Sequence, residues 1–187
     1  LGQEIDKSYL KEVEKLSLNP VSNSNLKLVF TSLHGTAITL LPEALKRFGF
    51  KNIHILESQA APNGDFPTIE SPNPEEAEAL DLALQKAQEI NADIVIGCDP
   101  DSDRVGIAVR DDKNQLILLN GNQTAAVLFD YILNQKRITN SLPKNGFVAS
   151  TVVTSNLLEN IAKSYSISAY QTLTGFKWIA ELIKKLE

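Results

Sequence analysis

The sequence predicts an α/β fold: a mixed, mostly parallel sheet flanked by helices, followed by the start of a second, similar α/β domain. Two observations carry this prediction. Short apolar segments typical of strands alternate with amphipathic segments typical of helices, and the alternation starts again after a polar stretch over residues 138–146. With 187 residues and 43% hydrophobic content, the chain can bury one core and hold a piece of a second domain.

The first part of the chain consists of an amphipathic segment and then two successions of strand, loop and helix. The amphipathic segment has apolar side chains three and four positions apart, as on one face of a helix. The expected elements are a helix over 3–16, a strand over 26–30, a helix ending at Phe48, a strand over 52–57 and a helix that Asn73 opens as N-cap, with Pro74 as its first residue.

A short apolar strand over residues 92–98 follows, of the kind that is buried on both faces of a parallel sheet. The later elements are expected to be a hairpin over 105–109 and 116–119, a helix over 122–135, a strand over 147–153, a helix over 156–163, a strand over 168–173 and a helix over 176–186. We therefore predict one domain over residues 1–140 and a partial second domain over residues 141–187.

Charge and cysteine content narrow the function classes. The net charge of −5, with no stretch rich in Lys and Arg, disfavours nucleic acid and anionic membranes as partners. The single cysteine, Cys98, cannot form an internal disulfide, and no signal-like or membrane-length apolar run is seen. We expect a cytoplasmic protein. Because the sequence begins with Leu1 and contains no methionine, we also expect it to be a segment of a longer polypeptide.

Three aspartates occupy alternate positions directly after the strand over 92–98, in the loop DPDSDR over residues 99–104. A short turn brings alternate side chains to one side, so Asp99, Asp101 and Asp103 can converge on one small cation. Hard oxygen ligands suit Mg²⁺, which usually keeps a coordination position for water or a phosphate oxygen. The loop therefore predicts a Mg²⁺ site for phosphate chemistry, with Arg104 as a forked donor to phosphate oxygens.

Other interpretations of this loop stay open. Arg104 can instead form a salt bridge that only relieves repulsion among the aspartates. The loop can be an acidic surface turn, although three like charges at one turn raise the free energy unless a cation compensates them. An EF-hand is disfavoured, because Arg104 and Arg110 stand where that loop needs Gly and Glu. A D-x-D phosphatase of the haloacid dehalogenase type would use Asp99 as nucleophile, but Asp103 stands where those enzymes usually have Thr or Val.

Four stretches resemble one known family, the alpha-D-phosphohexomutases (phosphoglucomutases and phosphomannomutases). The most specific is IVIGCDPDSDRVG over residues 94–106, which resembles the family's metal-binding loop. FTSLHG over 30–35 and FPTIESPNPE over 66–75 resemble parts of the family's second domain, and TGFKWI over 174–179 resembles a substrate-facing loop of its third domain. The similarity covers nearly the whole chain.

The resemblance implies part of a four-domain isomerase that interconverts hexose 1-phosphate and hexose 6-phosphate through a phosphoserine and a bisphosphorylated sugar. It implies that residues 1–140 are the second domain and residues 141–187 part of the third. In that scheme the three aspartates hold Mg²⁺ and Arg104 contacts the phosphate. The sugar phosphate is contacted by four residues near the start of the last helix: Thr174, Gly175, Phe176 and Lys177.

The chain also departs from the complete family pattern. It contains no seryl loop, no glutamate-rich sugar loop and no phosphate-binding last domain. We therefore expect it to need the first and fourth domains of the same polypeptide and to be inactive alone. Without the resemblance, Thr174 is more simply a helix N-cap and Phe176 a core residue packed on Ile179 and Ile183. A D-x-D phosphatase and a non-catalytic, metal-stabilised binding module remain the alternative functions.

Overall fold

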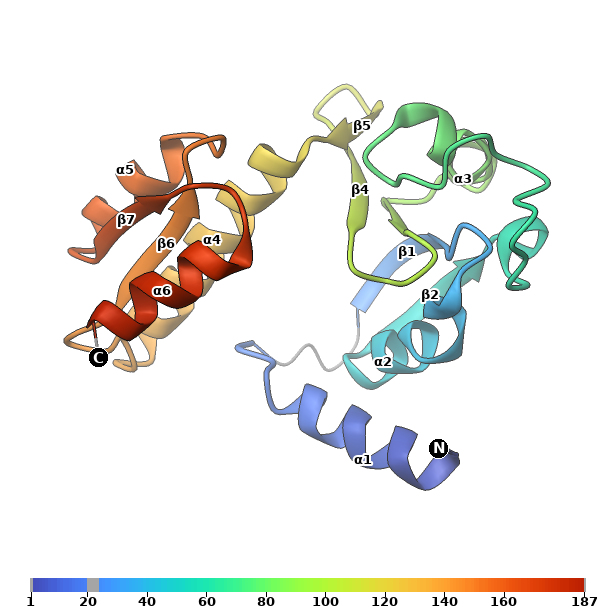
Figure 1. Cartoon of the computed structure of the whole chain (residues 1–187). Helices are drawn as coiled ribbons and strands as arrows, with labels where there is room; N and C mark the ends of the chain where they lie inside the picture. Colours follow the sequence, from blue (N-terminus) through green and yellow to red (C-terminus); the bar gives the residue numbers. More distant parts are fainter. Residues whose placement is uncertain (1, 20–23, 187) are drawn as a thin grey trace. The chain divides into compact units, whose positions relative to one another are not determined.

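The protein is built of two compact units, Leu1–Asn120 and Gly121–Glu187, each with its own sheet and helices (Figure 1). A computed structural model describes residues 2–19 and 24–186. Both units combine strands with flanking helices, so the predicted α/β fold class is confirmed.

The first unit contains a mixed five-stranded sheet in the order β2-β1-β3-β4-β5. The strands are β1 (Ser24–Thr31), β2 (Phe50–Ile55), β3 (Ile94–Cys98), β4 (Val105–Arg110) and β5 (Leu116–Leu119). The helices and 3₁₀ turns are α1 (Gln3–Glu14), η1 (Thr36–Thr39), α2 (Leu41–Arg47), η2 (Glu57–Gln59) and α3 (Ala77–Glu89). Strand β1 pairs in parallel with β2 and β3, whereas β4 pairs antiparallel with β3 and β5.

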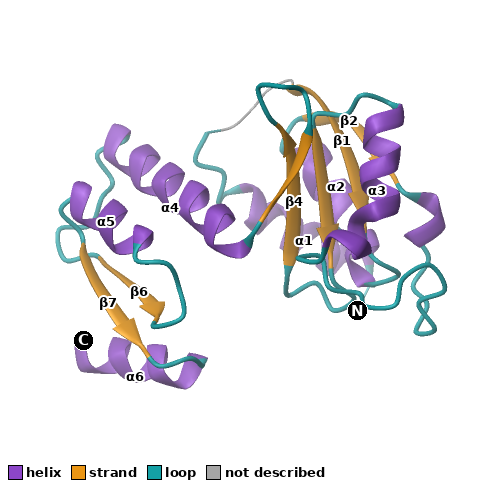
Figure 2. Ribbon diagram, turned by 90° about the horizontal axis from the view of Figure 1, so that it is seen from above, coloured by secondary structure: helices purple, strands orange, loops and turns teal. Residues whose placement is uncertain are grey.

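Helices cover both faces of this sheet, so β1 and β3 are buried (Figure 2). Alternate side chains of a strand point to opposite faces. Accordingly, Val29 on β1 belongs to a core cluster with Ala87 of α3, while its neighbours Leu28 and Phe30 belong to a separate cluster with Leu45 of α2. This two-sided burial explains why successive residues are apolar over 28–30 of β1 and 94–96 of β3.

Helix α3 begins later than the sequence predicts. Asn73 does not cap it but closes a turn, in which the backbone N–H of Glu76 donates to the Asn73 carbonyl (3.0 Å) and the N–H of Glu75 to Asn73 Oδ1 (3.2 Å). Pro74 in this turn is buried. Gly106 of β4 lies so close that a Cβ at position 106 would overlap the carbonyl oxygen of Pro74. The segment packs against the sheet as a turn, and the helix follows it.

The second unit contains a two-stranded parallel sheet with three helices. Its elements are α4 (Gly121–Ile138), β6 (Phe147–Thr151), α5 (Leu157–Ser164), β7 (Ser168–Thr172) and α6 (Phe176–Leu186). The unit begins at Gly121, whereas the predicted boundary lies at residue 140, because α4 packs on α5. Asn122 Oδ1 accepts a hydrogen bond from the Ser155 N–H (2.9 Å), and Asp130 accepts one from the Tyr165 hydroxyl (2.8 Å).

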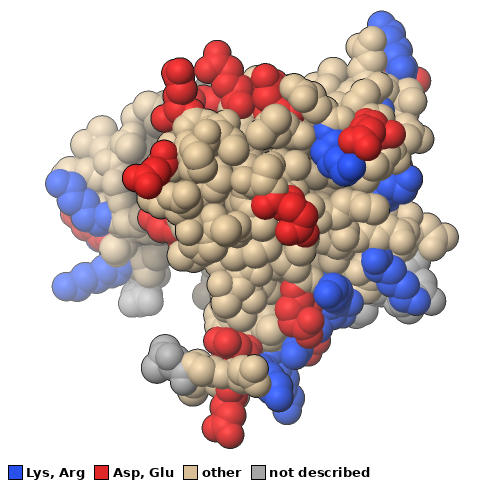
Figure 3. Space-filling view, turned by 90° about the vertical axis from the view of Figure 1, so that its right-hand side faces the viewer, with Lys and Arg blue, Asp and Glu red and all other residues tan. Residues whose placement is uncertain are grey.

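The charges and the helices of the described residues can each be compared with the composition. Lys and Arg side chains lie scattered on the face shown in Figure 3, with acidic side chains among them. Within residues 2–19 and 24–186, none of the helices has the length and apolar character needed to cross a bilayer.

Candidate metal centre

The aspartate loop over residues 99–104 is a tight turn between β3 and β4. The Ser102 N–H donates to the Asp99 carbonyl (3.0 Å), which closes a four-residue turn with Pro100 in its second position, where the fixed φ of proline is favoured. Ser102 has a left-handed φ of 65°. The Arg104 N–H then donates to Asp99 Oδ1 (2.9 Å), so the loop folds back on the first aspartate.

This turn brings the three aspartates together. One carboxylate oxygen from each of Asp99, Asp101 and Asp103 lies within 4.8 Å of the others. Asp99 is only 1% exposed, whereas Asp101 and Asp103 are exposed. The cluster therefore has one buried oxygen ligand fixed by the fold and two that face solvent.

Arg104 compensates the charge of the buried aspartate. Its Nε donates to Asp99 Oδ2 (2.9 Å) and lies 3.6 Å from an Asp103 oxygen. Burial would raise the pKa of Asp99, but the backbone and side-chain hydrogen bonds from Arg104, the hydrogen bond with Asp103 and the guanidinium charge together hold it below its ordinary value. The ion-pair interpretation of Arg104 therefore describes this structure, and it does not preclude a phosphate contact.

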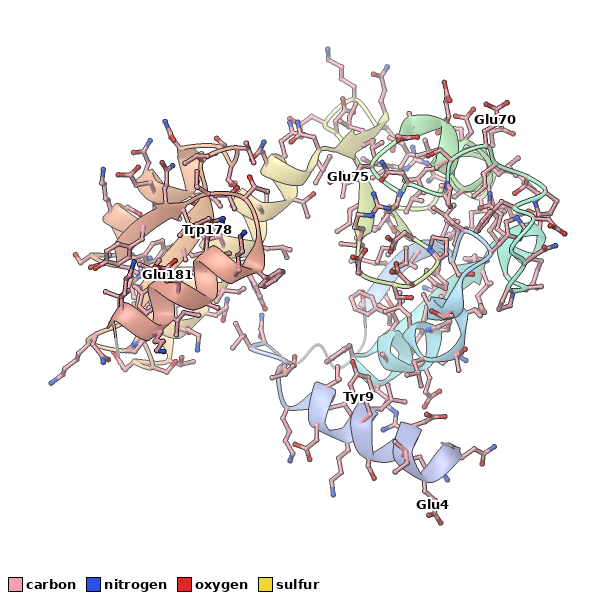
Figure 4. All side chains as sticks on the ribbon, in the orientation of Figure 1. Glu4, Tyr9, Glu70, Glu75, Trp178 and Glu181 are labelled. Atoms are coloured by element: carbon pink, nitrogen blue, oxygen red, sulfur yellow. The ribbon has the colours of Figure 1, made fainter. Side chains whose placement is uncertain are left out.

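The outer aspartates repel one another. The hydrogen bond with Asp99 and the charges of Asp101 and Asp99 raise the pKa of Asp103. The hydrogen bond to Asp99 and the charges of nearby carboxylates raise the pKa of Arg104. One of these carboxylates is Glu75, from the segment before α3 (Figure 4). A site with this excess of negative charge is suited to a cation.

Two close contacts involve the loop and the strand that follows it. A Cβ built on Gly35 would overlap the backbone of Pro100, and the next residue, Thr36, donates its N–H to the Pro100 carbonyl (2.9 Å). After the loop, Gly106 of β4 lies against Pro74. Neither contact is predicted by the sequence patterns. The glycines in the FTSLHG and IVIGCDPDSDRVG stretches are the signal that could indicate them.

A buried polar network holds the loops near Thr31. Gln59 is fully buried, and its Oε1 accepts a hydrogen bond from the Thr31 hydroxyl (2.6 Å). Its Nε2 donates to Thr68 Oγ1 (3.0 Å), which also lies 2.9 Å from Nε2 of the buried His34. His34 thus has a structural role in the loop that carries Gly35.

The four predicted sugar-phosphate residues lie in the second unit, at the turn from β7 to α6. Gly175 has a φ of 124°, and its carbonyl accepts the Trp178 N–H (3.1 Å). Phe176 is 88% exposed, so the interpretation of it as a core residue is wrong. Lys177 Nζ lies 4.9 Å from the centre of the Trp178 ring. The aspartate loop belongs to the first unit.

Comparisons with known proteins assign both units. Residues 7–113 match the family described as phosphoglucomutase/phosphomannomutase, alpha/beta/alpha domain II, and residues 120–187 match its alpha/beta/alpha domain III. The chain belongs to the phosphoglucomutase/phosphomannomutase family. The predicted family membership is thereby confirmed, and the aspartate loop lies within the domain II part of this family.

The curated relatives are longer than this family member. It is 38% identical over 183 residues to a phosphoglucomutase of Staphylococcus epidermidis, covering 98% of this chain and 33% of that protein. A phosphoglucomutase of Staphylococcus aureus is 36% identical over 179 residues, covering 96% of this chain and 32% of that protein. The chain thus spans about a third of the length of the curated relatives it matches.

Solved structures share the phosphoglucomutase/phosphomannomutase fold. A family protein from Burkholderia thailandensis superposes with a TM-score of 0.75 at 17% identity, covering 97% of this chain and 36% of that one. N-acetylphosphoglucosamine mutase of Aspergillus fumigatus, solved in complex with GlcNAc-6P and magnesium, gives a TM-score of 0.62 at 20% identity, covering 95% and 35%.

Proposed function

We propose that this chain supplies the Mg²⁺-binding part of a phosphohexomutase, which interconverts hexose 1-phosphate and hexose 6-phosphate through a phosphoserine and a bisphosphorylated sugar. The observation that carries this proposal is the convergence of three aspartate oxygens within 4.8 Å at the end of β3. Membership of the phosphoglucomutase/phosphomannomutase family supports it. The phosphoserine would come from a part of the relatives that this chain does not span.

The chemistry of the donor set fits Mg²⁺. Asp99, Asp101 and Asp103 offer three hard carboxylate oxygens, and octahedral coordination by these three leaves positions for water and a phosphate oxygen. When bound, Mg²⁺ would polarise that phosphate oxygen and offset negative charge during phosphoryl transfer. The buried Asp99 fixes the inner end of the site, because its backbone and both of its side-chain oxygens are held within the loop.

Arg104 is proposed to contact the transferred phosphate. Of the three guanidinium nitrogens, only Nε is engaged with Asp99 in the described contacts, and half of the side chain is exposed to solvent. The terminal nitrogens of the guanidinium can therefore donate to phosphate oxygens while Nε holds Asp99. One residue would thus orient both the buried metal ligand and the reacting group.

Thr174, Gly175, Phe176 and Lys177 are proposed to bind the sugar phosphate. They lie at the N-terminal end of α6, an 11-residue helix whose first N–H groups favour anions. Exposure of Phe176 supports a ligand contact over a core role, and Lys177 adds a positive charge. This loop and the aspartate cluster belong to different units, so sugar-phosphate binding needs a test separate from that of metal binding.

Metal binding by the 187-residue chain tests the first claim. We expect Mn²⁺, used as a paramagnetic substitute for Mg²⁺, to bind the unsubstituted chain, and Asp101→Asn to weaken binding at least about tenfold because one charged ligand is lost. Asp112→Asn is the matched control, since Asp112 is an exposed aspartate in the β4–β5 turn outside the cluster. Equal affinity of the Asp101→Asn and Asp112→Asn variants would show that the aspartates do not bind the metal.

Activity can be tested by grafting. The chain replaces the matching third of the Staphylococcus epidermidis phosphoglucomutase, and conversion of glucose 1-phosphate to glucose 6-phosphate is measured. We expect the graft to be active with Mg²⁺ and to lose at least about a hundredfold in rate with Asp101→Asn. Lys177→Ala in the same graft should raise KM more than it lowers kcat. A folded graft that binds metal but never turns over would contradict the proposed function.

The alternative D-x-D phosphatase needs Asp99 as an accessible nucleophile. Asp99 is 1% exposed and both of its side-chain oxygens accept hydrogen bonds from Arg104, which disfavours attack on a phosphate ester. We expect the chain alone to release no phosphate from p-nitrophenyl phosphate with Mg²⁺. Hydrolysis that Asp99→Ala abolishes would favour the phosphatase instead.

A further inference from the structure

Thr36 contacts the aspartate loop through two groups. It begins η1, the 3₁₀ turn after β1, and lies 64 residues before Pro100 in the sequence. Its N–H donates to the Pro100 carbonyl (2.9 Å), and its Oγ1 donates to the same oxygen (3.0 Å). The same Oγ1 lies 3.2 Å from Ser102 Oγ. Thr36 therefore contacts Pro100 and Ser102, the two residues that separate the three aspartates.

The number of hydroxyl hydrogens decides which group donates in each of these contacts. A hydroxyl has one hydrogen, and that of Thr36 is directed to the Pro100 carbonyl. The hydrogen between the two hydroxyls must then come from Ser102, so Ser102 donates to Thr36 and Thr36 to Pro100. Such a chain of donors links the two sides of the turn through one side chain. The backbone N–H of Thr36 alone would hold only Pro100.

We propose that Thr36 is a positioning residue for the aspartate cluster: its hydroxyl fixes the turn that sets Asp101 and Asp103 at ligand distance from Asp99. Asp99 does not need this help, because it is buried and held by Arg104. The two outer aspartates are exposed, and the turn that carries them is tied down at Pro100 and Ser102. The inference rests on the proposed metal role of the cluster.

Metal selectivity is the property that such positioning should control. Mg²⁺ requires near-ideal octahedral geometry at short distances, whereas Ca²⁺ accepts longer and less regular coordination. A turn that is less firmly held should therefore lose affinity for Mg²⁺ more than for Ca²⁺. A variant that merely destabilised the folded unit would weaken both ions alike. The ratio of the two affinities separates positioning from general stability.

The test compares Thr36→Val, Thr36→Ser and Thr39→Val in the 187-residue chain by calorimetric titration with Mg²⁺ and Ca²⁺. We expect Thr36→Val to weaken Mg²⁺ binding about fivefold and Ca²⁺ binding less than about twofold, since one hydroxyl bridge is lost. Thr36→Ser keeps the hydroxyl and should restore the ratio. Thr39 lies in the same 3₁₀ turn with no hydrogen bond to the loop among the described contacts, so Thr39→Val should change nothing.

Hydrogen exchange of the metal-free chain provides a second measurement. The Ser102 N–H, bonded to the Asp99 carbonyl, should exchange faster in Thr36→Val and at the original rate in Thr39→Val. Unchanged exchange together with an unchanged Mg²⁺/Ca²⁺ ratio would overturn the role of Thr36 and leave the metal site intact. If exchange changes but the unsubstituted chain binds neither ion, the proposed function fails, and with it the role of Thr36 toward a metal.

Discussion

Replacement of Gln59 by leucine should destabilise the first unit by a predictable amount. The side chain is fully buried, its Oε1 accepts the Thr31 hydroxyl at 2.6 Å, and its Nε2 donates to Thr68 at 3.0 Å. Leucine has a similar volume, so little cavity forms. What is lost is therefore the hydrogen bonds of Gln59 with Thr31 and Thr68. These two residues differ in whether water can take the place of the Gln59 side chain.

The magnitude follows from the exposure of those partners. Thr68 is exposed, so water can replace the lost amide. Thr31 is 0% exposed, and although its oxygen still accepts the Leu33 N–H (3.1 Å), its hydrogen loses its acceptor. One stranded buried donor costs about 2 kcal/mol. For a cooperative unit of this size, that corresponds to a decrease of about 8 °C in Tm.

Thermal and urea unfolding followed by far-ultraviolet circular dichroism would measure this loss. Gln115→Leu is the matched control, because Gln115 is exposed in the same unit and the same substitution there should change stability by less than about 0.5 kcal/mol. If Gln59→Leu is as stable as Gln115→Leu within about 0.5 kcal/mol, the Thr31 hydroxyl has another acceptor and the reasoning is wrong.

Three further predictions concern other parts of the chain. Gly106→Ala should shift the turn at Pro74 and lower Tm by several degrees, since the new methyl group overlaps the Pro74 carbonyl; Gly64→Ala, which has open space, is the control, and equal Tm values would contradict the contact. Burial and the Asp99 charge raise the pKa of Cys98 to about 11. At pH 8, Ellman's reagent should therefore react with the folded chain more than about 100-fold slower than with the urea-unfolded chain. Equal rates would be inconsistent with the burial of Cys98. The hydrogen bond that Tyr165 donates to Asp130 raises the pKa of Tyr165, so the folded state favours the protonated phenol. The resulting stabilisation is present below the ordinary tyrosine pKa and is lost as the pH rises through the raised pKa of Tyr165. Absorbance titration at 295 nm should show one late-titrating tyrosine in the unsubstituted chain that is missing from Tyr165→Phe.

The sequence predicted those parts of the fold that depend on local patterns. The strand over residues 26–30 and the strand over 92–98 appear as β1 and β3, because burial on both faces requires apolar side chains at successive positions. The loop that follows β3 has its aspartates together, as expected of alternate positions in a tight turn. The assignments of these residues to metal and phosphate remain predictions.

Features that depend on contacts between distant residues could not be predicted in this way. Amphipathic spacing identifies α4 as a helix, but it does not say in which unit the helix packs. The predicted boundary at residue 140 therefore lies after α4, whereas the second unit begins at Gly121. Likewise, Asn73 and Pro74 have the residue types of a helix start, yet packing against Gly106 makes them a turn. The contact of Thr36 with Pro100 joins residues 64 positions apart, for which spacing gives no signal.

The bracing of the aspartate loop has a consequence for protein engineering. The six residues over 99–104 contain every carboxylate of the proposed Mg²⁺ site, so transplanting this hexapeptide into another scaffold is an obvious way to try to build a small magnesium-binding protein. Its shape, however, is held by Gly35 and Thr36, which contact Pro100, and the strand that follows it packs against Pro74 at Gly106. A transplanted hexapeptide would bring the three aspartates without the residues that hold the loop in shape. A working transplant would have to carry three separate stretches of the chain together.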